Sequence, residues 1–235
     1  GTARGQAQRW ISIGPFTLQP PEFAKLAVII TSAKTLSKGE EDGKLQKKGF
    51  RRFIPVLLRF SIPFILIMKQ PDLGTAMVLL VIMMGMLFVM DISYKFILSL
   101  IGIGVVSAPL MWFKILNLEQ KDRILVFLNP GLDPMGDGYN LMQSITAIGS
   151  GRLMGKDFLR GNTLSQLDFL PAAHTDFIFS VIVEALGFLG GITIIILYGI
   201  IIFRSIRIER NSKDAFGSLI VIGIIAMQMA HIFEN

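Results

Sequence analysis

The stretch FIFSVIVEALGFLGGITIIILYGIIIF, residues Phe177–Phe203, decides the fold class of this chain. Its single charged residue is Glu184, and the run is longer than the roughly 20 apolar residues that cross the hydrocarbon core of a bilayer. Apolar runs of this length with almost no charge are typical of transmembrane helices. The segment therefore predicts a membrane protein.

The composition of the whole chain agrees. Hydrophobic residues make up 52% of the 235 residues and charged residues only 17%, and the mean hydropathy is +0.60. A soluble domain carries about 25% charged residues. The net charge of +6 is concentrated in two short stretches between apolar runs, which argues against a nucleic-acid partner. With no cysteine and only two histidines, neither a disulfide framework nor a histidine-based metal site is expected.

Five further apolar runs extend the prediction. The clear ones are Leu73–Met90, Phe96–Phe113 and Ala215–Phe233; the weaker ones are Phe23–Leu36, with Lys25 and Lys34, and Phe53–Met68, with Arg59 and two prolines. Taken alone, the two weaker runs fit buried or interfacial helices as well as spans. Together the runs predict an all-α, polytopic helical membrane protein with about six transmembrane helices. Residues 1–235 are expected to form a single integral membrane domain that is a fragment of a longer protein.

Two basic stretches predict the orientation. Residues 34–52 contain Lys34, Lys38, Lys44, Lys47, Lys48, Arg51 and Arg52, and residues 204–213 contain Arg204, Arg207, Arg210 and Lys213. Short loops this basic stay in the cytoplasm. The runs starting at residues 53, 73, 96 and 177 lie between them, an even number of crossings, so both loops fall on one side as required. The same parity makes residues 1–20 an outer loop and residues 114–176 a large outer loop that carries the candidate active site.

Within the large outer loop, Tyr139–Ile148 has the pattern of a short amphipathic helix, with an apolar stripe of Leu141, Met142, Ile145 and Ile148. Such a helix could lie at the outer membrane surface. The nearby segment GSGRLMGK, Gly149–Lys156, does not fit a phosphate-binding loop, because Ser150 stands where the first glycine belongs.

The strongest chemical feature is FLPAAHTDFIF, residues Phe169–Phe179, where the outer loop meets the longest apolar run. Thr175 or Asp176 can cap the following helix by accepting hydrogen bonds from its first free N–H groups. A carboxylate at the membrane edge can also serve as a general base, because partial desolvation raises the pKa of a carboxyl group towards the working range. Both roles stay open for Asp176.

Other charged residues have two interpretations each. Glu22 and Lys25 are three residues apart on one helix face, which fits an ion pair or a substrate contact. Arg59 and Glu184 lie inside apolar runs and need partners or water. The outer-face cations either hold a pyrophosphate or are simply solvated; they are Arg4, Arg9, Arg152, Lys156 and Arg160.

Four blocks of sequence, in order along the chain, resemble the SEDS family of membrane proteins. They are GTARGQAQRWISIGPFTLQPPEFAKL from Gly1, KQPDLGTA from Lys69, DPMGDGYNLMQSITAIGSG from Asp133 and FLPAAHTDFIFSVIVEALGF from Phe169. The resemblance covers essentially the whole chain. KQPDLGTA and GNTLSQLDFLP, from Gly161, are more similar to the cell-elongation branch than to the division or sporulation branches.

The resemblance implies a ten-helix fold, of which this chain covers the fourth to the ninth helix, in the bacterial plasma membrane. It implies an inverting glycosyltransferase that polymerises lipid II into β-1,4 glycan strands on the extracytoplasmic face and releases undecaprenyl pyrophosphate. By resemblance Asp176 is the catalytic base, and the substrate-binding residues are Arg9, Trp10, Glu22, Lys25, Gln143, Ser144, Lys156, His174 and Thr175. The implied partners are a class B penicillin-binding protein and other membrane proteins of the elongation complex. The resemblance implies no cofactor with certainty, and a divalent cation stays open.

Two positions depart from the family pattern. A glutamate of the family is Ala172 here, and the second glutamate of a usual pair is Ala185. The first change leaves open whether a second carboxylate assists Asp176.

Two functions from other classes compete with the polymerase. A lipid II flippase would depend on charges at mid-membrane depth, such as Arg59 and Glu184. A non-catalytic scaffold for a transpeptidase would tolerate the loss of Asp176.

Overall fold

The computed structural model describes residues 2–4, 7–13, 16–41, 54–70, 72–90, 94–156 and 177–234. The chain divides into two compact units, Gly1–Phe113 with Phe203–Glu234, and Lys114–Ile202. Both units consist mainly of α-helices, so the predicted all-α class is confirmed.

The first unit begins with three short strands, β1 (Thr2–Arg4), β2 (Ala7–Ile13) and β3 (Phe16–Leu18). Its helices are α1 (Pro20–Glu41), α2 (Ile54–Lys69), α3 (Leu73–Val89), α4 (Tyr94–Leu110) and α8 (Ala215–Glu234). A π-helical turn, η3 (Met111–Ile115), follows α4 directly after Pro109, whose ring disrupts regular helical hydrogen bonding.

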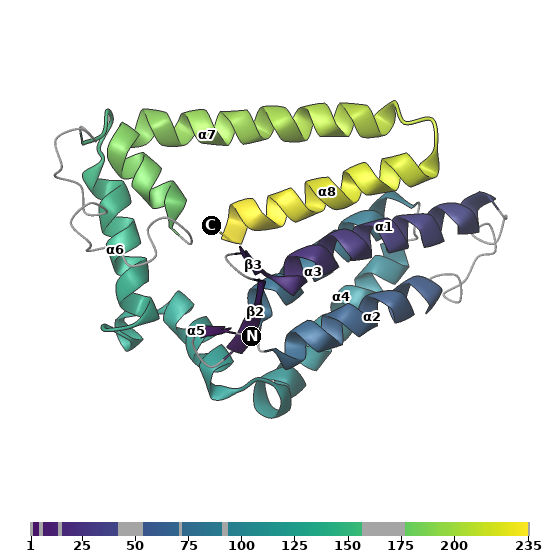
Figure 1. Ribbon diagram of the computed structural model, residues 1–235, viewed down its shortest axis with the longest axis horizontal. Coiled ribbons are helices and arrows are strands. Elements are labelled where there is room, and N and C mark those ends of the chain that lie inside the picture. The colour runs from purple at the N-terminus through teal and green to yellow at the C-terminus, as the bar shows by residue number, and fades with distance from the viewer. Residues whose placement is uncertain are drawn as a thin grey trace. The chain divides into compact units, whose positions relative to one another are not determined.

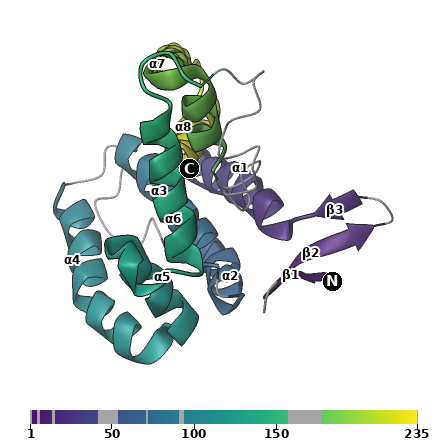
Figure 2. The same ribbon diagram turned by 90° about the vertical axis from the view of Figure 1, so that its left-hand side faces the viewer.

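The predicted outer loop 1–20 contains a small antiparallel sheet in the order β1-β2-β3. Trp10 pairs with Thr2, and Ile11 pairs with Leu18. The β2–β3 hairpin leads directly into the start of α1 (Figure 2). The apolar runs used to find helices carry no signal for strands of three to seven residues, which is why the sheet was not predicted.

The core of the first unit lies where α1, α2, α3 and α8 pack side by side (Figure 1). Small residues let the helix axes approach closely. A Cβ on Gly85 of α3 would stand 3.0 Å from the Cβ of Ala226 on α8, and one on Gly223 of α8 would stand 2.7 Å from Ile29 Cγ2 on α1. These glycines thus allow α8 to pack closely against both α1 and α3.

The second unit contains α5 (Leu118–Leu128), the 3₁₀ turn η4 (Pro130–Leu132), α6 (Asp137–Ser150) and the first part of α7 (Ile178–Arg210). Helix α5 was not predicted from the sequence, because charged residues interrupt its apolar ones and no long apolar run is formed. Its start is held by Asn117, whose backbone N–H donates to Gln120 Oε1 at 3.1 Å. The predicted amphipathic helix 139–148 is confirmed as α6, and Met142 and Ile145 of its apolar stripe are exposed.

Helix α7 is broken at Gly187, where φ is 71° and ψ is −169°. The turn after α6 takes over the hydrogen bonds that the break removes. The Phe188 N–H donates to Arg152 O at 2.8 Å, and Glu184 O accepts from the Lys156 N–H at 2.9 Å. A regular helix would instead join Phe188 N–H to Glu184 O. Backbone groups freed by a break within a membrane must find partners in the protein, and this turn supplies them.

Glycines make this contact between the turn and α7 possible. A Cβ on Gly151 would stand 2.2 Å from Val183 O, and one on Gly155 would stand 2.1 Å from Ala185 O. Only a residue without a side chain allows two backbones to approach so closely. Gly151 and Gly155 of the 149–156 segment therefore have a structural explanation that needs no phosphate.

Helices α7 and α8 are long and apolar enough to cross a membrane, and α3 is a shorter apolar helix. Large apolar side chains of α7, such as Leu189 and Ile195, are exposed, as expected for a helix that faces lipid. An outward-facing apolar groove of about 1050 Å³ runs along α3 and α8. The described residues thus form a helical membrane fold, and the count of six spans stays a prediction.

Two helices run beyond their predicted ends. α1 continues to Glu41, into the predicted loop 34–52, and α7 continues to Arg210, into the predicted loop 204–213. Basic residues in a last helical turn, here Lys38 and Arg207, are favoured by the helix dipole. The same charges that predicted a loop therefore extend the helix before it.

Candidate functional site

A cluster of polar side chains at helix ends in the first unit contains a deeply buried cation. Lys25 lies in the second turn of α1, and its side chain is 1% exposed. Its Nζ donates to Glu22 Oε1 at 2.8 Å, across one turn of the same helix. The structure thus contains the ion pair that the i,i+3 spacing predicts.

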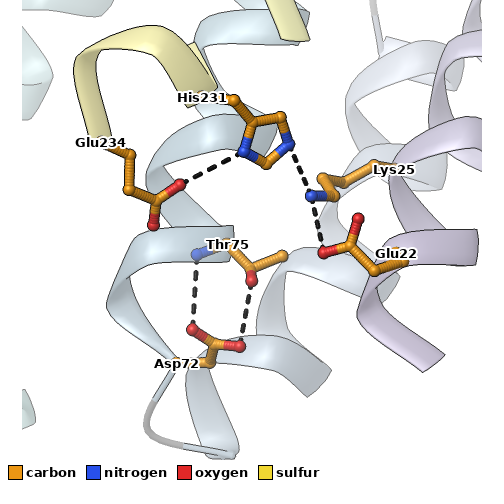
Figure 3. Close-up of polar contacts among 6 residues, drawn as sticks. All are labelled: Glu22, Lys25, Asp72, Thr75, His231 and Glu234. Carbon is orange, nitrogen blue, oxygen red and sulfur yellow. Dashed lines mark hydrogen bonds and ion pairs between the residues drawn. The ribbon is translucent and has the colours of Figure 1, made fainter. Parts of the chain in front are cut away.

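The second partner of Lys25 comes from α8, 206 residues away along the chain. Lys25 Nζ lies 2.8 Å from His231 Nε2, and His231 Nδ1 lies 3.4 Å from Glu234 Oε2. Figure 3 shows the imidazole ring between the lysine and the glutamate. We call Glu22, Lys25, His231 and Glu234 the Lys25 chain.

The start of α3 adjoins the Lys25 chain. Asp72 is buried and caps α3, accepting hydrogen bonds from the Thr75 N–H at 3.4 Å and from Thr75 Oγ1 at 3.0 Å. A Cβ on Gly74 would stand 2.3 Å from Glu234 Oε1 and 4.0 Å from Asp72 Oδ1. Gly74 therefore makes room for the Glu234 carboxylate. Figure 3 shows Asp72 and Glu234 in the same region, while Glu22 is the carboxylate that contacts the Lys25 ammonium.

The chemical capacity of this cluster follows from its donors. An ammonium has three N–H donors and no acceptor. Glu22 and His231 take two of these donors, and no third partner of Nζ is present in the described parts of the chain. An anionic group that reached this buried ammonium would therefore receive one charge-assisted hydrogen bond from a fixed position.

A second cluster lies in the other unit, around the break in α7. Glu184 is fully buried; its Oε1 lies 3.6 Å from Lys156 Nζ and accepts from Ser150 Oγ at 3.4 Å. Ser144 of α6 is buried, and its hydroxyl lies 2.5 Å from that of Ser180 on α7. Lys156 is 38% exposed, so its ammonium reaches both Glu184 and solvent.

The structure distributes the predicted site residues as follows. Glu22 and Lys25 are together in the first unit, where Arg9 and Trp10 lie on β2. Gln143 and Ser144 are on α6, and Lys156 follows it, all in the second unit. The predicted base Asp176 and its neighbours His174 and Thr175 lie outside the described residues. The roles of all nine substrate-binding residues and of Asp176 stay predictions.

Sequence reasoning missed three members of the first cluster, namely Asp72, His231 and Glu234. An ionisable residue within an apolar run is a candidate functional residue, and His231 lies near the end of the run Ala215–Phe233. Its partner, 206 residues away, could not be found from spacing. Among the described residues, no three His, Asp or Glu side chains converge in a way that could hold a metal ion.

The chain matches the family model FtsW/RodA/SpoVE, described as "Cell cycle protein", over residues 1–235. It is 37% identical over 233 residues to peptidoglycan glycosyltransferase MrdB of Escherichia coli K12, covering 97% of this chain and 60% of that protein. It is 37% identical over 242 residues to stage V sporulation protein E of Bacillus subtilis, covering 100% of this chain and 62% of that protein. This chain therefore spans about three fifths of the length of these relatives.

Solved structures show the same fold. A chain in a structure described as the coordination of polymerization and crosslinking by a peptidoglycan synthase complex aligns with a TM-score of 0.76 at 26% identity, over 97% of this chain and 61% of that one. The rod shape determining protein RodA of Thermus thermophilus aligns with a TM-score of 0.61 at 22% identity, over 99% of this chain and 57% of that one, a likeness of fold alone. The family model covers every residue of the chain, and the chain therefore belongs to the FtsW/RodA/SpoVE family, the SEDS proteins.

Proposed function

We propose that this protein is a peptidoglycan glycosyltransferase that polymerises lipid II into β-1,4-linked glycan strands, in the RodA-like role of cell elongation. Relatives that match 97% or more of the length of this chain carry the name peptidoglycan glycosyltransferase. The observation from the structure that carries the proposal is Lys25, a 1% exposed cation near the start of α1 with one partner on α1 and one on α8. Ionisable groups in such places are costly and usually functional.

The proposed reaction is a single displacement. Asp176 takes the proton from the 4-hydroxyl of the acceptor GlcNAc, whose oxygen attacks the anomeric carbon of the donor MurNAc. The new C–O bond forms as the bond to the pyrophosphate breaks, so the α-linked donor gives a β-linked product and undecaprenyl pyrophosphate leaves. No covalent enzyme intermediate is needed, and no step is assigned to a metal ion.

The remaining predicted residues bind substrate in this proposal. Lys25, Arg9 and Lys156 offset negative charge that builds up on the leaving pyrophosphate. Glu22 holds Lys25 in place. The sugars and the lipid headgroup are contacted by the other members of the set, Trp10, Gln143, Ser144, His174 and Thr175.

The setting of the reaction belongs to the same proposal. The protein crosses the plasma membrane several times with its active site on the extracytoplasmic face. It works with a class B penicillin-binding protein that cross-links the new strands, within an elongation complex. Support comes from the matched chain in a complex described as coordinating polymerization and crosslinking.

The flippase alternative requires ionisable groups that are available to a passing headgroup. Arg59 and Glu184, the two charges on which this alternative depends, instead have neighbours within their own units. Arg59 donates to Thr35 Oγ1, and Glu184 contacts Lys156 and Ser150. These contacts favour structural roles for both residues.

The test is glycan synthesis from purified lipid II by the full-length protein and its Asp176→Asn variant. Asn caps a helix about as well as Asp, so the melting temperature should hold while polymerisation falls by about 10²–10⁴-fold. Asp214→Asn is the matched control, because Asp214 caps α8 by accepting from the Gly217 N–H at 2.9 Å. It should leave polymerisation unchanged.

Three outcomes would count against the proposal. Wild-type protein that moves lipid II across vesicles and makes no glycan is a flippase. An Asp176→Asn variant with wild-type polymerisation removes the general-base assignment. A strongly lowered melting temperature with a proportional loss of activity assigns Asp176 to helix capping.

A further inference from the structure

We propose that His231 is the positioning residue for Lys25: its neutral imidazole, protonated on Nδ1, accepts a hydrogen bond from the ammonium and holds it towards the anionic part of the substrate. The inference rests on the proposed function for the substrate, but the contact itself stands on geometry. Lys25 Nζ lies 2.8 Å from His231 Nε2 and 2.8 Å from Glu22 Oε1.

The tautomer follows from the donors and acceptors. The ammonium paired with Glu22 can only donate, so His231 Nε2 must carry its lone pair towards Lys25. The proton of the neutral ring is then on Nδ1, which faces Glu234 Oε2 at 3.4 Å. A carboxylate near one ring nitrogen favours a proton on that nitrogen, which leaves the other nitrogen free to act as the acceptor.

Charged groups from three helices lie near the ring. Glu22 and Lys25 face it from α1, Glu234 is on α8, and Asp72 with Gly74 stands at the start of α3 (Figure 3). A second proton would place an N–H donor and a positive charge against the Lys25 ammonium at hydrogen-bond distance. The 2.8 Å Lys25–His231 contact therefore fits a ring whose Nε2 accepts from the ammonium.

Positioning of this kind has a clear benefit for a long side chain. Lysine has a flexible four-carbon stem, and fixing it on binding costs conformational entropy. Acceptors from two helices, Glu22 on α1 and His231 on α8, fix the ammonium before substrate arrives. An isolated i,i+3 pair on α1 does not do this, because its partner Glu22 is 52% exposed.

The first experiment compares side chains that differ in where they place an acceptor, using glycan synthesis by the full-length protein. Gln reaches as far as Nε2, whereas Asn reaches only as far as Nδ1. We expect His231→Gln to retain activity within about threefold, and His231→Asn and His231→Ala to lose at least about tenfold. Gln228→Ala, one turn earlier on α8, is the matched control and should stay near wild type.

The same assay separates positioning from a merely structural role. If His231 acts through Lys25, then adding His231→Ala to a Lys25→Met variant should cost no further activity, because the contact is already lost. Additive losses, or equal losses for His231→Gln and His231→Asn, would overturn the proposal.

The second experiment does not depend on catalysis. Nitrogen NMR of the ¹⁵N-histidine-labelled full-length protein in nanodiscs should show a ring protonated on Nδ1 with a hydrogen-bonded Nε2. The signal is assigned by its absence in His231→Gln, and it should shift in Lys25→Met. A ring protonated on Nε2 overturns the contact whatever the enzyme does. If the NMR shows the expected tautomer but the protein makes no glycan, the proposed function is wrong and the Lys25–His231 contact still holds.

Discussion

Lys25 illustrates how a single buried charge constrains a site. Removing an ion from water costs several kcal/mol, and only close partners with good geometry offset that cost. Lys25 has one such partner on its own helix and one on α8. Its position is therefore fixed by the packing of α1 against α8, and any change in that packing alters where the ammonium points.

The first prediction at this scale is that Lys25→Ala lowers glycan synthesis at least tenfold, a loss of about 1.4 kcal/mol in transition-state stabilisation. The protein should still insert and fold, because removing the buried ammonium also removes the free-energy cost of burying it. The measurement is the initial rate of strand formation from lipid II beside the melting temperature.

Lys34→Ala is the matched control for Lys25→Ala, because Lys34 is an exposed lysine on the same helix. It should change neither quantity. Near-normal synthesis by Lys25→Ala would reduce the Glu22–Lys25 pair to a structural salt bridge and would remove the main structural support for the proposed function.

At the scale of elements, the break in α7 is bridged by backbone hydrogen bonds from the turn after α6, which connects the two helices. The turn after α6 has Arg152 in a left-handed conformation, with φ of 49°, and Gly155 with φ of 83°. It exchanges backbone hydrogen bonds with α7 on both sides of Gly187. The exchange places Lys156 beside the buried Glu184, so a cation of the predicted outer loop and a helix carboxylate form one ion pair.

The prediction for this element is that Gly187→Ala destabilises the protein by about 1–3 kcal/mol, the cost of a strained backbone conformation. A Cβ there would also stand 2.3 Å from Gly155 N. Gly199→Ala is the matched control, because it lies in the same helix with open space around its Cα. It should be neutral or slightly stabilising, since Gly costs about 0.5–1 kcal/mol within a helix.

Thermal unfolding of both variants in the same detergent or nanodisc is the measurement. Equal melting temperatures for Gly187→Ala and Gly199→Ala would show that the left-handed conformation at residue 187 is not required.

How far the sequence predicts these elements depends on the kind of signal. Apolar runs located α3, α8 and the start of α7 to within one residue, because hydrophobic length is a direct requirement of the bilayer. The break at Gly187 could not be predicted, because the hydropathy of GFLGG is uninterrupted and the break depends on a turn some 30 residues earlier. The Glu22–Lys25 pair follows from local spacing, whereas His231 joins it only through the packing of α8 on α1.

At the scale of the whole molecule, contacts between helix ends agree with the relative helix directions that the predicted parity requires. The Lys25–His231 contact brings the start of α1 to the end of α8, and Gly74 against Glu234 brings the start of α3 to the same end. Arg59, early in α2, reaches Thr35, late in α1. The parity deduced from the basic loops requires the same neighbours. It predicts the starts of α1 and α3 and the end of α8 on the outer side, and the end of α1 and the start of α2 on the inner side.

The orientation itself is tested by single cysteines introduced at Lys44, Asp137 and Ser212, in a background without other reactive cysteines. This part of the chain contains none of its own. The basic stretches should keep Lys44→Cys and Ser212→Cys in the cytoplasm, protected from an impermeant thiol reagent in intact cells. Asp137→Cys, at the start of α6, should be labelled.

Permeabilised cells are the control, because all three cysteines should then react and show that protection reflects the membrane and not burial. Labelling of Lys44→Cys in intact cells would invert the orientation, move the Lys25 chain to the cytoplasmic side and remove lipid II polymerisation on the outer face as its function. Protection of Asp137→Cys alone, with the other two as expected, would be a narrower result. It would place α6 and the turn that completes α7 on the inner side, and the count of crossings between the two basic stretches would have to change.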